Sequence, residues 1–285
     1  MKRFLKTHLN RFLPSAVRHS IKQRMAAKFV TDVASKIEVE QTSAALKCRI
    51  EDDISFLAPL NCTHDLAYFT NTSEGRAEFD SIARASRVGG FLFDIGAHSG
   101  LVSALFCSAN PKNSVASFEP SPLLAERLLA IRDLNRFGDR MRIEQCGIGE
   151  QAGLVEMAID PVGGFVQTQR FDHSMWGAPQ PIKVKIESIE SAAARLNVVP
   201  QFLKIDIEGY EFEAIKGSLD FITRHRPAIF LEVHLNYLEA RGLSAKSLIT
   251  MLLDAGYGFY ASGGAGLKPS DVYDSPLPIV RVIAH

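Results

Sequence analysis

The chain has 285 residues, 46% of which are hydrophobic, and its 32 basic and 32 acidic residues give a formal net charge of zero. A chain of this length and apolar content can bury one large core, which excludes a disordered or fibrous protein. The balanced charge argues against a nucleic-acid partner, because nucleic-acid binding favours a basic surface. We therefore expect a globular protein whose partner is a small or neutral molecule.

The first 30 residues depart from this balance, since they contain eight lysines and arginines and no acid. Apolar residues from Phe4 to Leu13 recur at roughly helical spacing, which predicts a basic amphipathic helix as far as Pro14. Lys6 and Arg11 interrupt the apolar stretch and argue against a secretory signal. We expect a solvated helix packed on the domain; the alternative is peripheral contact of this basic segment with an anionic membrane surface.

The four cysteines are scattered, with no CxxC pair and no histidine at zinc-finger spacing. This pattern indicates neither a disulfide framework nor a structural zinc site. No apolar run approaches the roughly 20 residues that a membrane-spanning helix needs. These features favour a soluble, cytoplasmic protein.

Residues 37–87 carry one predicted element, a helix over 74–86, and give no indication of function. From about residue 88, short β-rich apolar runs alternate with longer helical patterns, which is typical of a parallel sheet covered on both faces. We therefore divide the chain into an N-terminal basic and helical extension with its lead-in, residues 1–87, and one domain, residues 88–285.

The domain is predicted to be α/β and Rossmann-like, a doubly wound, mostly parallel sheet of seven strands with an antiparallel edge strand. Predicted strands cover 91–94, 114–118, 141–146, 182–186, 202–207 and 228–233. Predicted helices cover 101–109, 123–135, 189–196, 211–223 and 245–255. Residues 257–260 and 278–283 are expected to pair as an antiparallel edge. The region 149–180, rich in glycine and proline, is predicted to form a hairpin and then an irregular excursion that helps to shape the substrate site.

A glycine-rich turn joins the first strand to the first helix and reads DIGAHSG over residues 94–100. Its glycines allow a sharp turn that leaves room for a ligand at the start of the helix. The dinucleotide-binding fingerprint has glycine where Asp94 stands, and a carboxylate there would repel a diphosphate. The same charge suits a cofactor with an ammonium and a sulfonium group, which favours S-adenosyl-L-methionine over NAD. We assign cofactor contacts to Asp94, Gly96, Ala97, His98 and Gly100.

Glu119 ends the second strand, and Pro120 after it stops the strand and presents the carboxylate at the carboxyl edge of the sheet. A carboxylate at this place can accept hydrogen bonds from both ribose hydroxyls of the cofactor. After the third strand, Gly147 and Ile148 offer a small surface against which an adenine ring could lie flat. We add these four residues to the predicted cofactor site.

Polar groups also stand at the ends of two further predicted strands. Asp206 and Glu208 stand at the end of the strand over 202–207, and Glu232 and His234 at the end of the strand over 228–233. Asp206 and Glu208 point the same way as long as the strand continues through them. Methyl transfer to an unactivated hydroxyl requires that the acceptor lose its proton, and a histidine titrates near neutrality. We predict that all four residues are catalytic, with His234 as the candidate base and Asp206 orienting the acceptor or the methionine end of the cofactor. The four could instead hold Mg or Mn, but their spacing is not diagnostic, and we assign no metal.

Four segments, FDIGAHSG, SFEPSP, FLKIDIEGYEFEAIKG and RPAIFLEVH, occur in this order and resemble the FkbM-type methyltransferases. The resemblance covers roughly residues 88–235. It implies a Rossmann-like sheet, use of S-adenosyl-L-methionine and methylation of hydroxyls, often on sugars or natural products. It also implies cofactor contacts from Asp94, Gly96, Gly100 and Glu119, with Asp206, Glu208 and Glu232 near the transfer site.

The chain departs from the usual pattern of that family at two places. His98 stands where asparagine is common, and residues 187–190, Glu-Ser-Ile-Glu, stand where Thr-Leu-Asp is common. The second departure bears on the acceptor more than on the cofactor. The sequence thus predicts an S-adenosylmethionine-dependent methyltransferase acting on a hydroxyl oxygen of a small molecule, sugar or glycan. The alternatives are a catalytically silent Rossmann-like scaffold that acts as an interaction protein, or an enzyme that uses another adenosine-containing cofactor such as NAD.

Overall fold

A computed structural model of the chain describes residues 36–51, 53–159, 165–166 and 180–285. The basic helix predicted at the N-terminus lies outside the described residues, and so does most of the excursion predicted after the hairpin. None of the helices in the described part of the chain is long and apolar enough to span a membrane.

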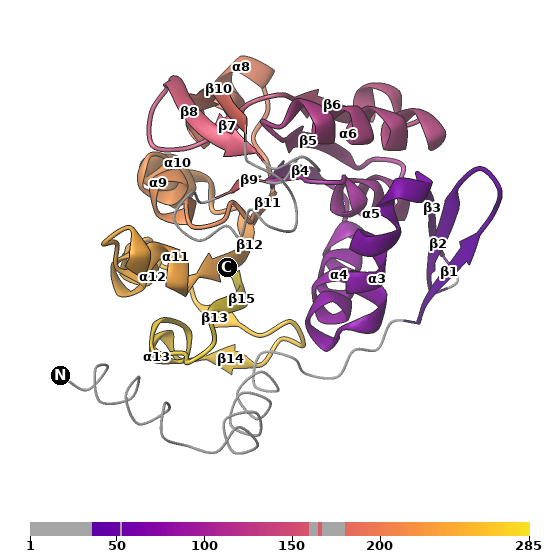
Figure 1. Cartoon of the computed structure of the whole chain (residues 1–285). Helices are drawn as coiled ribbons and strands as arrows, with labels where there is room; N and C mark the ends of the chain where they lie inside the picture. The colour runs from indigo at the N-terminus through magenta and orange to yellow at the C-terminus, as the bar shows by residue number, and fades with distance from the viewer. Residues whose placement is uncertain (1–35, 52, 160–164, 167–179) are drawn as a thin grey trace, which may run out of the picture.

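The main sheet has eight strands in the order β14-β13-β15-β12-β11-β4-β5-β6 (Figure 1). In chain order they are β4 (Phe91–Ile95), β5 (Ser114–Phe118), β6 (Met141–Glu144), β11 (Phe202–Ile205), β12 (Ala228–His234), β13 (Phe259–Tyr260), β14 (Gly266–Leu267) and β15 (Ile279–Ala284). The strands from β6 to β12 run parallel, whereas β15, β13 and β14 are antiparallel. The doubly wound α/β fold with an antiparallel edge is confirmed. It has one strand more than predicted, because the two-residue β14 pairs with β13.

The chain order of these strands creates a crevice next to β4. From β4 the chain proceeds through β5 and β6 on one side and then returns to β11 on the other side. In open α/β sheets, ligands bind at the carboxyl ends of the strands where the winding direction changes. The fold therefore places the expected ligand site between the ends of β4 and β11.

Nine helices cover the main sheet in the described part of the domain. They are α5 (Leu101–Ala109), α6 (Pro122–Leu134), η2 (Gly138–Arg140), α8 (Ile189–Leu196), α9 (Glu211–Lys216), α10 (Leu219–His225), α11 (Leu235–Ala240), α12 (Ala245–Asp254) and α13 (Pro269–Tyr273). Neighbouring residues of β4 belong to different hydrophobic clusters, Leu92 to one and Phe93 to the other. Because successive side chains of a strand face opposite ways, the sheet has a core on each face.

The helix predicted over 211–223 is wrong as a single element, since α9 and α10 are separate. The break falls at Gly217 and Ser218. A side chain at Gly217 would come within 2.6 Å of backbone atoms of Glu150, so the chain is tightly packed there. The Ser218 hydroxyl accepts hydrogen bonds from the backbone amides of Ile189 and Glu190 at the start of α8. These tertiary contacts override the local helical pattern.

A second, four-stranded sheet has the order β7-β10-β8-β9. It comprises β7 (Gly147–Ile148), β8 (Gly153–Ile159), β9 (Phe165–Val166) and β10 (Gln180–Glu187). The predicted hairpin is present as the antiparallel pair β8 and β9. The strand predicted at 182–186 belongs to this sheet, where β10 pairs antiparallel with β8.

The lead-in segment forms a layer of its own against α5 and α6, with a three-stranded antiparallel sheet, a short 3-10 helix and two α-helices (Figure 1). Its elements are β1 (Ile37–Gln41), β2 (Leu46–Ile50), β3 (Ile54–Ala58), η1 (Leu60–Cys62), α3 (Thr63–Asn71) and α4 (Ser73–Ser86). The helix predicted at 74–86 is confirmed as α4, whereas the small sheet was not predicted. Cys48, Phe56 and Phe79 from this layer are buried in the same cluster as Leu105 and Phe106 of α5.

Candidate active site

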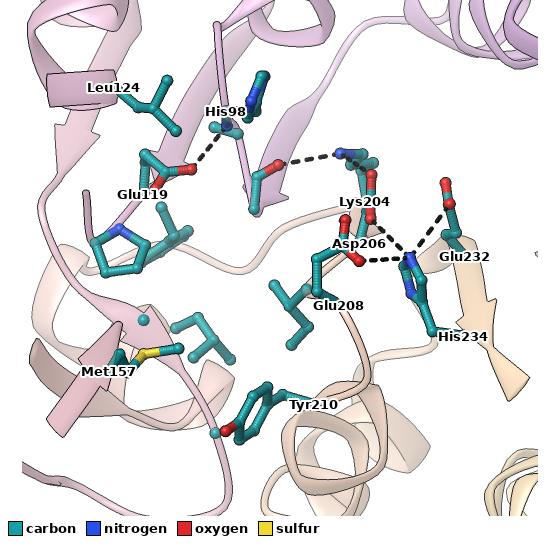
Figure 2. A pocket seen from close by; sticks show the side chains of 18 of the residues that line it. His98, Glu119, Leu124, Met157, Lys204, Asp206, Glu208, Tyr210, Glu232 and His234 are labelled. Carbon is teal, nitrogen blue, oxygen red and sulfur yellow. Dashed lines mark hydrogen bonds and ion pairs between the residues drawn. The ribbon is translucent and has the colours of Figure 1, made fainter. Parts of the chain in front are cut away.

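A cavity of about 1070 Å³ opens at the carboxyl ends of β4, β5, β11 and β12. Most of the residues predicted for the site line this cavity (Figure 2). They are Gly96, Ala97, His98, Glu119, Pro120, Gly147, Ile148, Asp206, Glu208, Glu232 and His234. Asp94 and Gly100 were also predicted to contact the cofactor, but they are not among the lining residues.

The turn after β4 is held by hydrogen bonds to the neighbouring strand. The backbone amides of Gly96 and Ala97 donate to the carbonyl oxygen of Phe118, at 3.0 and 3.1 Å. Gly96 has a φ of +81°, and a Cβ at this position would lie 1.9 Å from the carbonyl oxygen of Asp206. Only glycine therefore allows the turn to approach the end of β11 so closely.

Glu119 is 3% exposed and connects this turn to the end of β5. Its carboxylate accepts hydrogen bonds from the backbone amides of His98, at 2.9 Å, and Ser121, at 3.0 Å. Burial raises the pKa of Glu119 to about 7, although both amides favour the charged form. A carboxylate has more lone pairs than these two bonds use, so Glu119 can accept further hydrogen bonds from a ligand.

Asp94 lies behind the turn and is completely buried. Its carboxylate accepts a hydrogen bond of 2.6 Å from Ser103, and the ammonium group of Lys204 is 4.0 Å away. Burial raises the pKa of Asp94, while Lys204 and Ser103 act in the opposite direction. The structure thus places this charge beneath the cavity, next to a buried cation.

Lys204 is the cation at the floor of the cavity, and its side chain is 8% exposed. Its ammonium donates hydrogen bonds to the carbonyl of Gly96, at 3.1 Å, and to Asp206, at 3.2 Å. Burial alone would lower the pKa of Lys204. The surrounding carboxylates, Asp206 and Asp94 above all, outweigh this effect and raise the pKa above its ordinary value, so the ammonium group stays charged. Sequence reasoning gave Lys204 no role, although a lysine within a buried apolar strand was an available signal.

Asp206 and Glu208 follow β11 in a different way from that predicted. The strand ends at Ile205, and Glu208 has a φ of +53°, so the two acids lie in a turn and not on one extended strand. Both nevertheless approach Nε2 of His234, Glu208 to 3.3 Å and Asp206 to 3.9 Å (Figure 2). The attraction of Lys204 and His234 outweighs burial and lowers the pKa of Asp206.

His234 is 1% exposed and lies among carboxylates on both sides of its ring. Nδ1 is 2.9 Å from the buried Glu211, and Nε2 is 3.4 Å from Glu232. Burial would lower the pKa of His234, but the hydrogen bond with Glu211 and the charges of the nearby acids raise it to about 9. The imidazole is therefore protonated at neutral pH.

Glu232 lies between His234 and Arg281, whose Nη2 is within 2.8 Å of both carboxylate oxygens. Burial, followed by the charge of Asp206, raises the pKa of Glu232 to about 8, against the effect of Arg281. Its protonation state thus changes near neutral pH.

One donor atom each from Asp206, Glu232 and His234 lie within 4.8 Å of one another, which is close enough to hold a metal ion. Lys204 and Arg281 already pair with the two carboxylates, and a protonated His234 has no lone pair to give. Lys204, Arg281 and the protonated His234 therefore already balance the charges of Asp206 and Glu232.

The cavity also has a wall that the sequence motifs did not reveal. Tyr68 of α3, Glu78 of α4 and Arg281 of β15 line it. Arg281 contacts Glu78 at 3.3 Å, and its guanidinium lies 5.4 Å from the centre of the Tyr68 ring. The one sequence signal for this wall was a single arginine within an otherwise apolar strand.

The fold and site together define a Rossmann-like α/β protein with a deep, acidic ligand cavity at its topological switch point. The sequence matches the methyltransferase FkbM domain over residues 94–259. The chain therefore belongs to the FkbM methyltransferase family, which confirms the resemblance carried by the four sequence segments.

A search of solved structures found methyltransferases with low similarity to this chain. The methyltransferase FkbM from Methylobacillus flagellatus is 18% identical, with a TM-score of 0.42, over 69% of this chain and 43% of that one. This chain thus spans less than half the length of that protein. An S-adenosylmethionine-dependent methyltransferase from Agrobacterium tumefaciens is 9% identical, with a TM-score of 0.44, over 86% of this chain and 70% of that one. No curated protein matches the sequence significantly.

Proposed function

We propose that this protein is an S-adenosylmethionine-dependent methyltransferase whose acceptor atom is a hydroxyl oxygen of a small molecule, sugar or glycan. One observation carries the proposal. A single cavity joins the turn at Gly96 and the carboxylate of Glu119 to the buried cluster of Asp206, Glu232 and His234. A cofactor held at one end would thus present its reactive group to the polar cluster at the other.

The charge of the cavity fits this cofactor. Its lining carboxylates outnumber its lysines and arginines; the acids are Asp65, Glu78, Glu119, Glu150, Glu156, Asp206, Glu208, Glu213 and Glu232, and the bases are Lys204, Arg241 and Arg281. Such a cavity repels a diphosphate and attracts a ligand with sulfonium and ammonium groups. Glu119, with its unused lone pairs, would accept hydrogen bonds from the ribose hydroxyls.

The charges of the cluster indicate which group takes the acceptor proton. When bound, the cofactor supplies a methyl group on a positively charged sulfur. His234 is the base suggested by the sequence, but a protonated imidazole cannot accept a proton. Glu232 lines the cavity, contacts His234 and has a pKa of about 8, below the value of about 9 for His234, so a larger fraction of Glu232 is unprotonated near neutral pH and able to accept a proton. We assign the base to Glu232, with His234 as the cation that holds the nearby carboxylates in place.

The proposal is tested by calorimetric titration with S-adenosylhomocysteine, and with NADH in parallel. The wild-type protein should bind the homocysteine compound and not NADH. Glu119→Ala should weaken that binding roughly 10- to 100-fold, because it removes one or two hydrogen bonds to a charged group. Glu126→Ala is the matched control, since Glu126 is exposed on α6 and does not line the cavity.

Each alternative has its own outcome in this titration. Binding of NADH in preference would favour an enzyme with a different adenosine cofactor. A wild-type protein that binds neither compound would favour a silent scaffold, and the assignment of Glu232 as base would then be withdrawn.

A further inference from the structure

We infer that Tyr68, Glu78 and Arg281 form the acceptor subsite of this cavity, and that this subsite selects an uncharged polyhydroxylated acceptor over an anionic one. We call these three residues the α3–β15 wall. The inference rests on the proposed function and deepens it, because it names the residues that choose the acceptor.

The α3–β15 wall adjoins the proposed base, because Arg281 contacts Glu232. Glu119 and His98 lie on one side of Lys204 and Asp206, and Glu232 and His234 lie on the other (Figure 2). Arg281 binds Glu232 and so extends the polar surface beyond the proposed base. An acceptor that places a hydroxyl at Glu232 must therefore put its neighbouring groups against this wall.

The wall contains a buried hydroxyl that has no hydrogen-bond partner among the described residues. This group is Oη of Tyr68, a residue that lines the cavity and whose ring lies under the guanidinium of Arg281. Burial raises the pKa of Tyr68, so the phenol stays neutral and can donate one hydrogen bond and accept another. A buried hydroxyl left unpaired is costly, and a ligand hydroxyl at this place would satisfy it.

The charges of the wall decide which kind of ligand fits. Arg281 is shared between Glu78, at 3.3 Å, and Glu232, at 2.7 Å, so both carboxylates already use its charge. A phosphate or carboxylate in this position would lie against Glu78 and Glu232, which already share Arg281, while His234 pairs with Glu232 from its other side. Hydroxyl groups can donate to Glu78 and Glu232 and also bond with Tyr68, so a neutral polyol matches the wall in both charge and hydrogen bonding.

The position of the wall in the sequence supports a role in selectivity. The match to the FkbM domain covers residues 94–259, which hold Glu119, Asp206, Glu232 and His234. Tyr68 and Glu78 precede this span, and Arg281 follows it. The chemistry thus resides within the family domain, whereas the surface that faces the acceptor comes from both flanks.

The first arm of the test measures transfer of radiolabelled methyl from S-adenosylmethionine to four sets of probes. These are methyl hexopyranosides, the corresponding 6-phosphates, the corresponding uronic acids and 2-amino-2-deoxy analogues. In the reaction the carbon–sulfur bond breaks with its electron pair left on sulfur, the acceptor oxygen bonds the methyl carbon, and Glu232 takes the proton. We expect at least one neutral glycoside to be methylated, with kcat/KM roughly tenfold or more above its anionic analogues, because the carboxylates of the wall repel a like charge.

Three results would overturn the inference. The first is a preference for a phosphorylated or uronic acid probe, and the second is a preference for an amino sugar. The third is a protein that binds S-adenosylhomocysteine but methylates none of the probes, which would leave the proposed cofactor intact. If S-adenosylhomocysteine does not bind, the proposed function fails and the inference fails with it.

The second arm uses variants that preserve the shape of the wall. Tyr68→Phe keeps the ring under Arg281 and removes the hydroxyl, so KM for the neutral acceptor should rise about tenfold, the loss of one hydrogen bond. Affinity for S-adenosylhomocysteine and the thermal midpoint should stay at the wild-type values. Tyr260→Phe, outside the cavity, is the matched control. An unchanged KM, or a parallel loss of cofactor affinity, would contradict the assignment.

Glu78→Gln provides a signature that a structural role would not give. Removing this carboxylate leaves Arg281 with one acid in place of two, so discrimination against the 6-phosphate probe should fall by about tenfold, the effect of one nearby charge. Glu74→Gln, one turn earlier on α4, does not touch this cavity and should leave the discrimination unchanged. A Glu78→Gln protein that folds normally and keeps the wild-type discrimination would rule out the charge argument.

Discussion

His234 is held between the carboxylates of Glu211 and Glu208, and these contacts set its charge. Its folded-state pKa of about 9 lies above its ordinary value of 6.5, so the folded protein holds a proton that the unfolded chain releases between these pH values. The stabilisation is fully present below pH 6.5 and is lost as the pH rises through 9. Glu232 also makes the free energy of unfolding fall with rising pH, up to about pH 8, because its pKa is raised in the folded protein as well.

We therefore expect the free energy of unfolding to fall from pH 6.5 to pH 9 in the wild-type protein. In His234→Gln this slope should decrease by up to about 1.4 kcal/mol per pH unit, the value for one proton. Urea titrations at half-unit steps of pH measure it. His225→Gln, at an exposed position on α10, serves as the control. Parallel curves for wild type and His234→Gln would contradict a charged His234.

Lys204 gives a second prediction, because Asp94 and Asp206 both depend on its charge. Lys204→Met should lower the free energy of unfolding by about 3–5 kcal/mol, since it leaves buried carboxylates without a cation. Adding Asp94→Asn should restore part of this loss. Lys216→Met is the matched control, because Lys216 pairs with Glu150 at the surface and should cost less than about 1 kcal/mol. Denaturant unfolding of the wild type, Lys204→Met, Lys204→Met with Asp94→Asn, and Lys216→Met measures these free energies. Equal losses for Lys204→Met and Lys216→Met would refute the prediction.

Individual site residues were predictable from the sequence where they follow a recognisable strand. Glu119 and Asp206 directly follow such strands and Glu232 lies two residues before the end of one, and parallel strands bring their ends to one edge. Asp94 also ends a strand, but its side chain lies behind the turn, a difference that spacing alone does not reveal. Tyr68 comes from helix α3 and Arg281 from strand β15, and neither belongs to a motif, so only the folded chain brings them to the cavity.

At the scale of elements, the turn between β4 and α5 is the part on which the site depends most. Gly96→Ala should abolish binding of S-adenosylhomocysteine and lower stability, because its Cβ would collide with the backbone of Asp206. Gly264→Ala is a matched control: its φ of +86° is close to the +81° of Gly96, but no atom lies near its Cβ. That variant should cost only the roughly 1–2 kcal/mol of a left-handed residue. Calorimetry and thermal unfolding of both proteins measure the difference, and equal effects would refute the steric argument.

The elements themselves were predictable where local pattern and tertiary packing agree. The helix over 101–109 and the strand over 114–118 have the predicted bounds, since both are apolar runs buried in the core. The small sheet of β1, β2 and β3 was missed, although buried residues alternate regularly along β2 and β3. Its strands are short and pair only with one another, so the alternation of strands and helices along the domain does not predict them.

At the scale of the whole molecule, the lead-in layer completes one of the two cores. Phe56 and Phe79 from this layer are at most 2% exposed, and they share a cluster with Leu92 and Phe106 of the main sheet and α5. Each such side chain contributes roughly 1.5–3 kcal/mol when fully buried. Removing the layer would therefore take away this burial and expose the side chains of α5 and the main sheet that pack against it.

This layer yields a prediction about where the folding unit begins. A chain of residues 88–285, the boundary suggested by the sequence alternation, should fail to fold cooperatively and should bind a hydrophobic dye, because the apolar side chains of α5 and β4 that pack against this layer would be exposed. A chain of residues 36–285 should keep the thermal midpoint and the S-adenosylhomocysteine affinity of the full protein. Thermal unfolding and dye fluorescence of the two truncated chains measure this. A cooperative transition in the shorter chain would show that the sheet is stable without α3 and α4, and the α3–β15 wall would then be an addition to a complete domain. Loss of folding in the shorter chain alone would mean that the layer that completes the core also carries Tyr68 and Glu78 of the α3–β15 wall, so that selectivity and stability depend on the same segment.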